Sequence, residues 1–303
     1  MTSAWPALPL GEWQDTYATL HLLTQIVGKT RLALAPPQNH WWHVTLYLTS
    51  RGLTTSPMPY RDRNVEIEFD FIDQQLVGRT SDGLVRTLPL VAQPVAEVYR
   101  AYRKLLDALG ISVHIWTRPQ ESAGTIPFEQ DTTHTAYDGA AAARCWRVLA
   151  EADRLLKQFR GRFLGKSSPS HFWWGSFDLA CTRFSGAKAP PHPGGIPNLS
   201  DRVTREAYSH ACISAGFWPG SMGTPVAEPA FYAYAYPEPA GCAEAPISPG
   251  TGRYDVNFRE WILPYDAARA TPDPRQTVLD FFESTYETAA RLAQWDRALE
   301  RSA

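Results

Sequence analysis

Three of the eight histidines in the sequence lie where a proton-transfer or metal site could form. His134 stands four residues before Asp138 at the start of an expected helix, so the two side chains would share one helix face. His171 directly precedes the strand-like segment FWWGSFDLAC, and His210 ends the tripeptide YSH. Imidazoles with a carboxylate suit zinc, iron or copper, and an imidazole alone serves as a general acid or base.

These residues define two overlapping sets of candidates. The candidate metal ligands are His134, Asp138, His171 and His210, and the candidate cofactor is one transition-metal ion, iron, copper or zinc. The candidate catalytic residues are His134, His171, His210 and Asp178. Two other interpretations stay open, because the histidines could transfer protons without a metal or could be structural. If the site is correct, His171→Ala should leave the fold intact and abolish binding or turnover.

Aromatic residues indicate a pocket for a small molecule. The segment FYAYAYPEP alternates large and small residues, which predicts a strand with its tyrosines on one face. The segment GFWPG places Trp218 between glycines. Amphipathic rings around a few polar groups are typical of ligand pockets. The alternative is that the tyrosine hydroxyls face water. The candidate substrate-binding residues are Trp174, Arg183, Trp218, Tyr232, Tyr234, Tyr236 and Glu238.

Two of these candidates carry charge and would select the ligand. Arg183 would bind a carboxylate or a phosphate through its planar guanidinium. Glu238 follows the tyrosine strand and would meet a cationic group. The sequence has no GxGxxG or GxxxxGK[ST] motif to hold a nucleotide phosphate and no GxSxG nucleophile motif.

The elements that must position these residues follow from hydrophobic periodicity and from Gly and Pro. The pattern predicts helices over 12–27, 94–109, 137–160 and 274–300. It predicts strands over 31–35, 41–49, 65–72, 111–116 and 173–182. Gly28 is expected to end the first helix. In the strand over 65–72, Glu66, Glu68 and Asp70 are expected on a solvated face. Regular periodicity is lost in 184–252, apart from the tyrosine strand, so this region is expected to be an irregular insertion.

The two halves of the chain show a related pattern. Placing residues 39–51 over 171–183 aligns Trp41-Trp42 with Trp173-Trp174. An internal duplication explains this match, and the alternative is a coincidence of two aromatic segments. The predicted fold is α+β, with two related halves that each form an antiparallel sheet with helices on one face, packed with pseudo-two-fold symmetry. The predicted domains are 1–120 and 121–303, the second containing the 184–252 insertion.

Composition narrows the class of protein. The net charge is −2, from 29 Lys and Arg against 31 Asp and Glu, which argues against a strongly basic nucleic-acid binder and leaves a local basic groove as the alternative. No apolar run reaches the roughly 20 residues that a membrane helix needs, and the N-terminus does not read as a secretory signal. Four cysteines without a CxxC pair predict reduced, buried thiols. The expectation is a soluble cytoplasmic protein that contacts neither membrane nor nucleic acid.

Several motifs resemble an uncharacterised bacterial family known only as a domain of unknown function. They are WQDTYATLHLLTQIVGK (13–29), HWWHVTLYLTSRGLTTSPMPY (40–60), EFDFID (68–73), SPSHFWWGSFDLACTRFSG (168–186), YSHACISAGFWPG (208–220) and FYAYAYPEP (231–239). The resemblance covers nearly the whole chain. It implies no activity, cofactor or partner, and it implies only that these stretches belong to one module.

The residues predict an enzyme acting on a small molecule. Its His and carboxylate site would lie in a cleft between the two halves, walled by 184–252, and it could depend on a metal. The first alternative is a non-catalytic binding protein with a pocket of Tyr and Trp. A third interpretation is an interaction scaffold that presents the Pro-rich loops.

Overall fold

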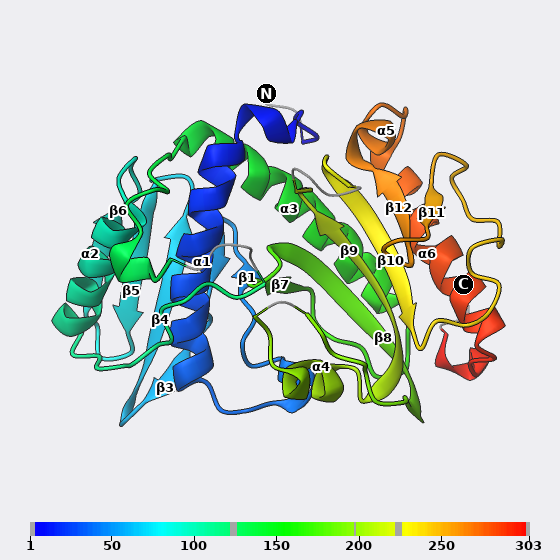
Figure 1. The fold of residues 1–303 in the computed structure, drawn as a ribbon, viewed down its shortest axis with the longest axis horizontal. Helices are drawn as coiled ribbons and strands as arrows, with labels where there is room; N and C mark the ends of the chain where they lie inside the picture. The colour runs from blue at the N-terminus through cyan, green and yellow to red at the C-terminus, as the bar shows by residue number, and fades with distance from the viewer. Residues whose placement is uncertain (1–3, 122–125, 197, 222–225, 301–303) are drawn as a thin grey trace.

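The computed structural model describes residues 4–121, 126–196, 198–221 and 226–300. This part of the chain forms two six-stranded antiparallel sheets and six α-helices, which confirms the predicted α+β class. Figure 1 shows the two sheets in separate halves of the molecule. The helices are α1 (Gln14–Leu34), α2 (Val95–Ala108), α3 (Gly139–Gly161), α4 (Asp201–Ala207), α5 (Tyr265–Arg269) and α6 (Pro274–Leu292).

The N-terminal sheet has the strand order β1-β2-β4-β5-β6, and β3 pairs with the free end of β4. Its strands are β1 (Tyr47–Leu48), β2 (Gly52–Thr54), β3 (Met58–Tyr60), β4 (Arg63–Asp70), β5 (Gln75–Thr80) and β6 (Val85–Pro89). The C-terminal sheet has the order β11-β12-β10-β9-β8-β7. Its strands are β7 (His171–Trp173), β8 (Asp178–Lys188), β9 (His210–Trp218), β10 (Ala230–Tyr236), β11 (Arg253–Asp255) and β12 (Glu260–Pro264).

The C-terminal sheet has one face on the core and one face on a cavity. Side chains of Leu179, Cys181, Phe217 and Phe231 join the hydrophobic core with residues of α3 and α6. Because side chains alternate along a strand, the intervening residues point to the opposite face. That second face carries Asp178, Ala180 and Thr182 from β8, Ser214 and Trp218 from β9, and Tyr232 and Tyr234 from β10.

The region 184–252 is not an irregular insertion. It supplies the end of β8, all of α4, all of β9 and all of β10, so it builds the centre of the C-terminal sheet. Its small residues interrupt the alternation of side chains by which a strand is recognised in a sequence. Gly216 lies opposite Tyr232 in the β9–β10 ladder, and a Cβ atom at Gly216 would overlap the Tyr232 ring. The glycine is therefore part of a strand that makes room for an aromatic side chain.

The first helix also differs from its prediction. It does not end at Gly28 but continues to Leu34, so the predicted strand over 31–35 is wrong. Gly28 is needed because a Cβ atom there would overlap the indole of Trp174. The last helix, by contrast, ends at Leu292, earlier than predicted. The predicted strand over 111–116 is absent from the described residues, and only Tyr47–Leu48 is strand within 41–49.

The proposed duplication is not supported at the aligned tryptophans. Trp41 lies in the 3-10 helix η2 (Asn39–Trp41), whereas Trp173 ends β7. The two segments nevertheless meet, because Leu46 and Phe172 exchange two backbone hydrogen bonds of 2.9 Å. This bridge joins the edge of one sheet to the edge of the other. The pseudo-two-fold symmetry and the division near residue 120 stay predictions.

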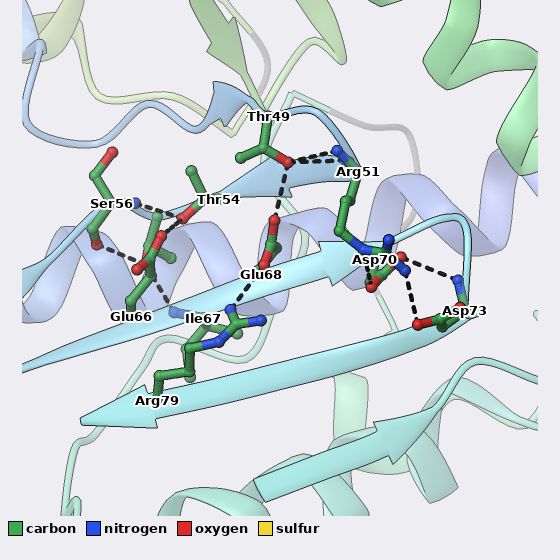
Figure 2. A network of polar contacts seen from close by, with 12 residues as sticks. Thr49, Arg51, Thr54, Ser56, Glu66, Ile67, Glu68, Asp70, Asp73 and Arg79 are labelled. Carbon is green, nitrogen blue, oxygen red and sulfur yellow. Dashed lines mark hydrogen bonds and ion pairs between the residues drawn. The ribbon is translucent and has the colours of Figure 1, made fainter. Parts of the chain in front are cut away.

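The acidic face of β4 is ordered rather than simply solvated (Figure 2). Asp70 accepts from Arg51 at 2.6 Å and is 3% exposed. Glu68 accepts from Thr49 at 2.9 Å and from Arg79 at 2.7 Å. The acids on this strand therefore have cationic or hydroxyl partners, which is how buried carboxylates are normally stabilised.

Two further observations bear on the class of protein. The four cysteines, Cys145, Cys181, Cys212 and Cys242, are free and buried. Within the described ranges, no helix has the length and apolar character required to cross a membrane.

Candidate functional site

A cavity of about 410 Å³, the main cavity, lies on the face of the C-terminal sheet that α3 and α6 leave uncovered. Strands β8, β9, β10 and β12 contribute side chains to it, and η2, α4 and residues 173–176 also line it. The lining residues come from both 32–120 and 121–262. Its aromatic lining residues are Trp41, Trp42, Trp173, Trp174, Phe184, Tyr208, Trp218, Tyr232, Tyr234 and Phe258.

Two tyrosines of β10 form one wall. The rings of Tyr232 and Tyr234 stack with centroids 6.2 Å apart and an interplanar angle of 13°. The Tyr234 hydroxyl lies 2.7 Å from the hydroxyl of Tyr208. Burial strongly raises the pKa of all three phenols, so they are neutral hydrogen-bonding groups at physiological pH.

Asp178, at the start of β8, is the polar centre of the main cavity. Its carboxyl group accepts hydrogen bonds from the hydroxyls of Ser176 and Tyr232. Desolvation raises the pKa of Asp178, and the two hydroxyl hydrogen bonds offset part of that rise. The carboxyl group is thus fixed in orientation and is easier to protonate than an ordinary aspartate.

Two glutamates line the same cavity. Desolvation, followed by the charge of Asp178, raises the pKa of Glu121 to about 7 and that of Glu260 to about 8. Glu121 lies over Gly175, where a Cβ atom would overlap its carboxylate. Three carboxyl groups therefore line one partly apolar space, in which burial and the charge of Asp178 favour retention of protons by the two glutamates near neutral pH.

A second cavity of about 350 Å³, the side cavity, adjoins the first. Glu121, Ser176 and Trp218 line both cavities. The side cavity is also lined by His134, whose Nδ1 lies 2.7 Å from a carboxylate oxygen of the buried Asp131. This contact orients the imidazole, as a carboxylate does in many acid–base sites.

The predicted site residues fall into separate groups. Asp178, Trp174, Trp218, Tyr232 and Tyr234 line the main cavity. Of the three candidate histidines, His134 lines the side cavity and the other two line neither of the two cavities. Sequence reasoning thus located the aromatic wall and one carboxylate.

The three histidines do not come together. His171 is 1% exposed and contacts the rings of Trp42, Tyr47 and Trp173, and burial lowers its pKa to about 3. The ring of His210 instead lies 5.6 Å from that of His40.

The fourth predicted metal ligand, Asp138, is the N-cap of α3 and accepts from the backbone of Ala140 and Ala141. Among the residues that the structure describes, no three His, Cys, Asp or Glu side chains are grouped so that they could hold a metal ion. The proposed ligand set therefore does not form one site.

Three other candidates lie outside the cavity. Arg183 is on the core face of β8, where it pairs with Glu283 at 3.2 Å and lies between the rings of Phe159 and Tyr286. Its position differs from the prediction because residues 178 and 183 are an odd number apart and so face opposite sides of the strand.

The remaining two candidates are engaged at the surface of the C-terminal sheet. Glu238 is bound by Arg259 and by the hydroxyl of Tyr254. Tyr236 donates to the backbone carbonyl of Pro190 at 3.0 Å. Neither residue lines the main cavity.

Several lining residues were missed by the sequence analysis. Glu260 could have been found, because EWILP alternates and pairs with the tyrosine strand. Glu121 gave no signal, because it lies in an irregular segment with a positive φ of 53°. Ser176 and Tyr208 also come from turns, where periodicity carries no information.

Comparisons with known proteins agree with the motif-based resemblance. A model of a family of unknown function, DUF5996, matches residues 5–301. No curated protein matches the chain. No solved structure matches it either. Because the family model covers nearly the whole chain, the protein belongs to the DUF5996 family.

Proposed function

We propose that the protein binds a small organic molecule in the main cavity. The observation that carries this proposal is the lining itself, in which aromatic rings surround a few fixed polar groups such as the Asp178–Tyr232 pair. The volume of about 410 Å³ falls in the range of small-molecule sites. Occupation by a ligand would bury these rings and satisfy the carboxyl groups.

The test is titration with the neutral dye N-phenylnaphthylamine, whose fluorescence rises in apolar surroundings. We expect saturable binding of one dye per chain. Five of the eleven tryptophans line the main cavity, so quenching of intrinsic fluorescence gives a second readout. Ala180→Trp should abolish binding because Ala180 lies on the floor of the cavity.

A matched control separates filling of the cavity from general damage. Leu164 is 56% exposed and does not line the cavity, so Leu164→Trp should leave dye binding unchanged. Thermal unfolding of both variants shows that each is folded. Equal dye binding by Ala180→Trp and the wild type would contradict the proposal.

An acid–base enzyme is the second candidate function. It is favoured by the carboxyl groups rather than by the histidines, because the raised pKa of Glu121, about 7, suits proton transfer near neutral pH. Asp178 would orient or protonate the bound molecule. For a molecule recovered from the cavity, we expect turnover by the wild type and binding without turnover by Asp178→Asn. Equal turnover by both proteins would exclude this role for Asp178.

We further propose a cytoplasmic location. The four free, buried thiols support it, because reduced cysteines persist in that compartment. The acidic lining of the main cavity also supports a small molecule, rather than a nucleic acid, as the partner.

A further inference from the structure

The charges that line the main cavity are of one sign. Asp178, Glu121 and Glu260 line it, whereas the described lining residues include no Lys and no Arg. His40 is the remaining basic group of the lining. Its Nδ1 lies 2.8 Å from the carbonyl of Ala207 and its Nε2 lies 2.9 Å from Nζ of Lys166. A ring that donates at one nitrogen and accepts at the other is neutral, so His40 does not balance the carboxylates.

The glutamates of the cavity differ from the other acids in the interior. Most acids with little exposure elsewhere in the described chain have a basic partner: Glu68 pairs with Arg79, Asp70 with Arg51, Glu151 with Arg275, Glu283 with Arg183, Asp131 with His134 and Asp153 with Lys157. The side chains of Glu121 and Glu260 make no hydrogen bond or ion pair to any described residue. A carboxylate that is partly removed from water and has no cationic partner destabilises the fold, so a cation from outside the chain would relieve that cost.

The aromatic walls of the main cavity also favour a cationic partner. Ammonium groups bind over the faces of Trp and Tyr rings within about 6 Å of the centroid. Lys166 and Lys29 already make such contacts with two rings of the wall, at 5.2 Å from Trp42 and 6.0 Å from Trp174, although neither lysine lines the cavity. A metal ion would gain little from these rings, and the described residues offer no group of three metal ligands.

We infer that the molecule bound in the main cavity is an organic cation, an amine or quaternary ammonium on an apolar body, with its charge held by Glu121, Glu260 and Asp178 and its body held by the Trp and Tyr walls. This inference rests on the proposed function and specifies the chemical class of its ligand. A bound cation favours the ionised carboxylates, so binding near neutral pH should release protons into the buffer.

The experiment is displacement of N-phenylnaphthylamine by three indole compounds of similar shape. Tryptamine is a cation, tryptophol is neutral and indoleacetate is an anion. We expect tryptamine to displace the dye at a concentration at least about tenfold lower than tryptophol, with indoleacetate weakest. Titration of tryptamine in two buffers of different ionisation enthalpy should show the proton release.

Glutamine variants test the residues. In Glu260→Gln and in Glu121→Gln the preference for tryptamine over tryptophol, measured as the ratio of their displacing concentrations, should fall several-fold. Glu287→Gln, at an exposed position of α6, is the control and should keep the full preference. The variants preserve side-chain shape, and urea unfolding confirms that each is folded.

The possible outcomes separate this inference from the proposed function. If the dye binds and tryptamine and tryptophol displace it equally well, the inference of a cationic ligand is wrong but the proposed binding site is retained. A preference that survives in both glutamine variants would also overturn the inference. If the dye does not bind the wild type, both the proposed binding site and the inference of a cationic ligand are wrong.

Discussion

Replacing Glu260 with glutamine should stabilise the folded protein, and the gain should grow between pH 5 and pH 9. Desolvation, with the charges of Asp178 and Asp255, raises the pKa of Glu260 to about 8 from its ordinary value of 4.5. Below pH 4.5 the carboxyl group is protonated in both states, so the substitution changes little. Between pH 4.5 and 8 only the unfolded state ionises, and the wild type loses stability that the variant keeps.

The difference between about 8 and 4.5 sets the upper limit of the gain. At roughly 1.4 kcal/mol per pKa unit, it corresponds to at most about 5 kcal/mol above pH 8. Glu260 is half-buried and lines a cavity that admits water, so screening reduces this value. We expect about 2 kcal/mol at pH 9 and about 0 kcal/mol near pH 4.

The assay is urea unfolding of both proteins at pH 5, 7 and 9. Tyr208, Tyr232 and Tyr234 also face Glu260, but their phenols stay neutral over this range. Glu287→Gln, at an exposed position of α6, serves as the control for loss of one carboxylate. A gain for Glu260→Gln that is the same at all three pH values, or a loss of stability at pH 9, would refute the reasoning.

Three further substitutions probe the walls of the cavity and the core behind it. Gly28→Ala should destabilise the protein by about 1–3 kcal/mol, because the new Cβ displaces the Trp174 ring and this outweighs the helix preference of alanine. A higher midpoint in thermal unfolding would contradict this prediction. Tyr232→Phe removes a hydrogen-bond donor from Asp178 and should lower the free energy of unfolding by about 1–3 kcal/mol in urea. Dye binding should be retained because the ring remains. An unchanged unfolding midpoint would argue against the hydrogen bond. Arg183→Leu removes the buried cation that pairs with Glu283 and leaves that carboxylate only the more exposed Arg162, at 3.6 Å. It should cost about 1–3 kcal/mol in urea unfolding, with dye affinity unchanged. A folded variant that had lost dye binding would show that Arg183 contributes to the site.

The sequence located the tyrosine wall because strand geometry is local. Side chains two residues apart share a face, so FYAYAY alone placed Tyr232 and Tyr234 together. The same rule explains the error at Arg183, which was grouped with Asp178 although the two lie on opposite faces of β8.

Other features depend on contacts between distant segments. Gly28 reads as a helix end, yet its role is to admit Trp174 from a segment about half the chain away. Glu121 joins Asp178 only because a loop after the N-terminal half lies against the C-terminal sheet. The spacing of His134, His171 and His210 along the chain carries no information on whether they meet in the fold.

A crystal structure of the protein soaked with tryptamine tests the central claim most directly. We expect one tryptamine in the main cavity, with its indole between the Trp and Tyr walls and its ammonium within hydrogen-bond distance of Glu260, Glu121 or Asp178. Dye displacement by tryptamine in solution would show that the site is occupied under the same conditions. An ordered tryptamine at another surface, with the main cavity filled by its own side chains or by water, would contradict the account.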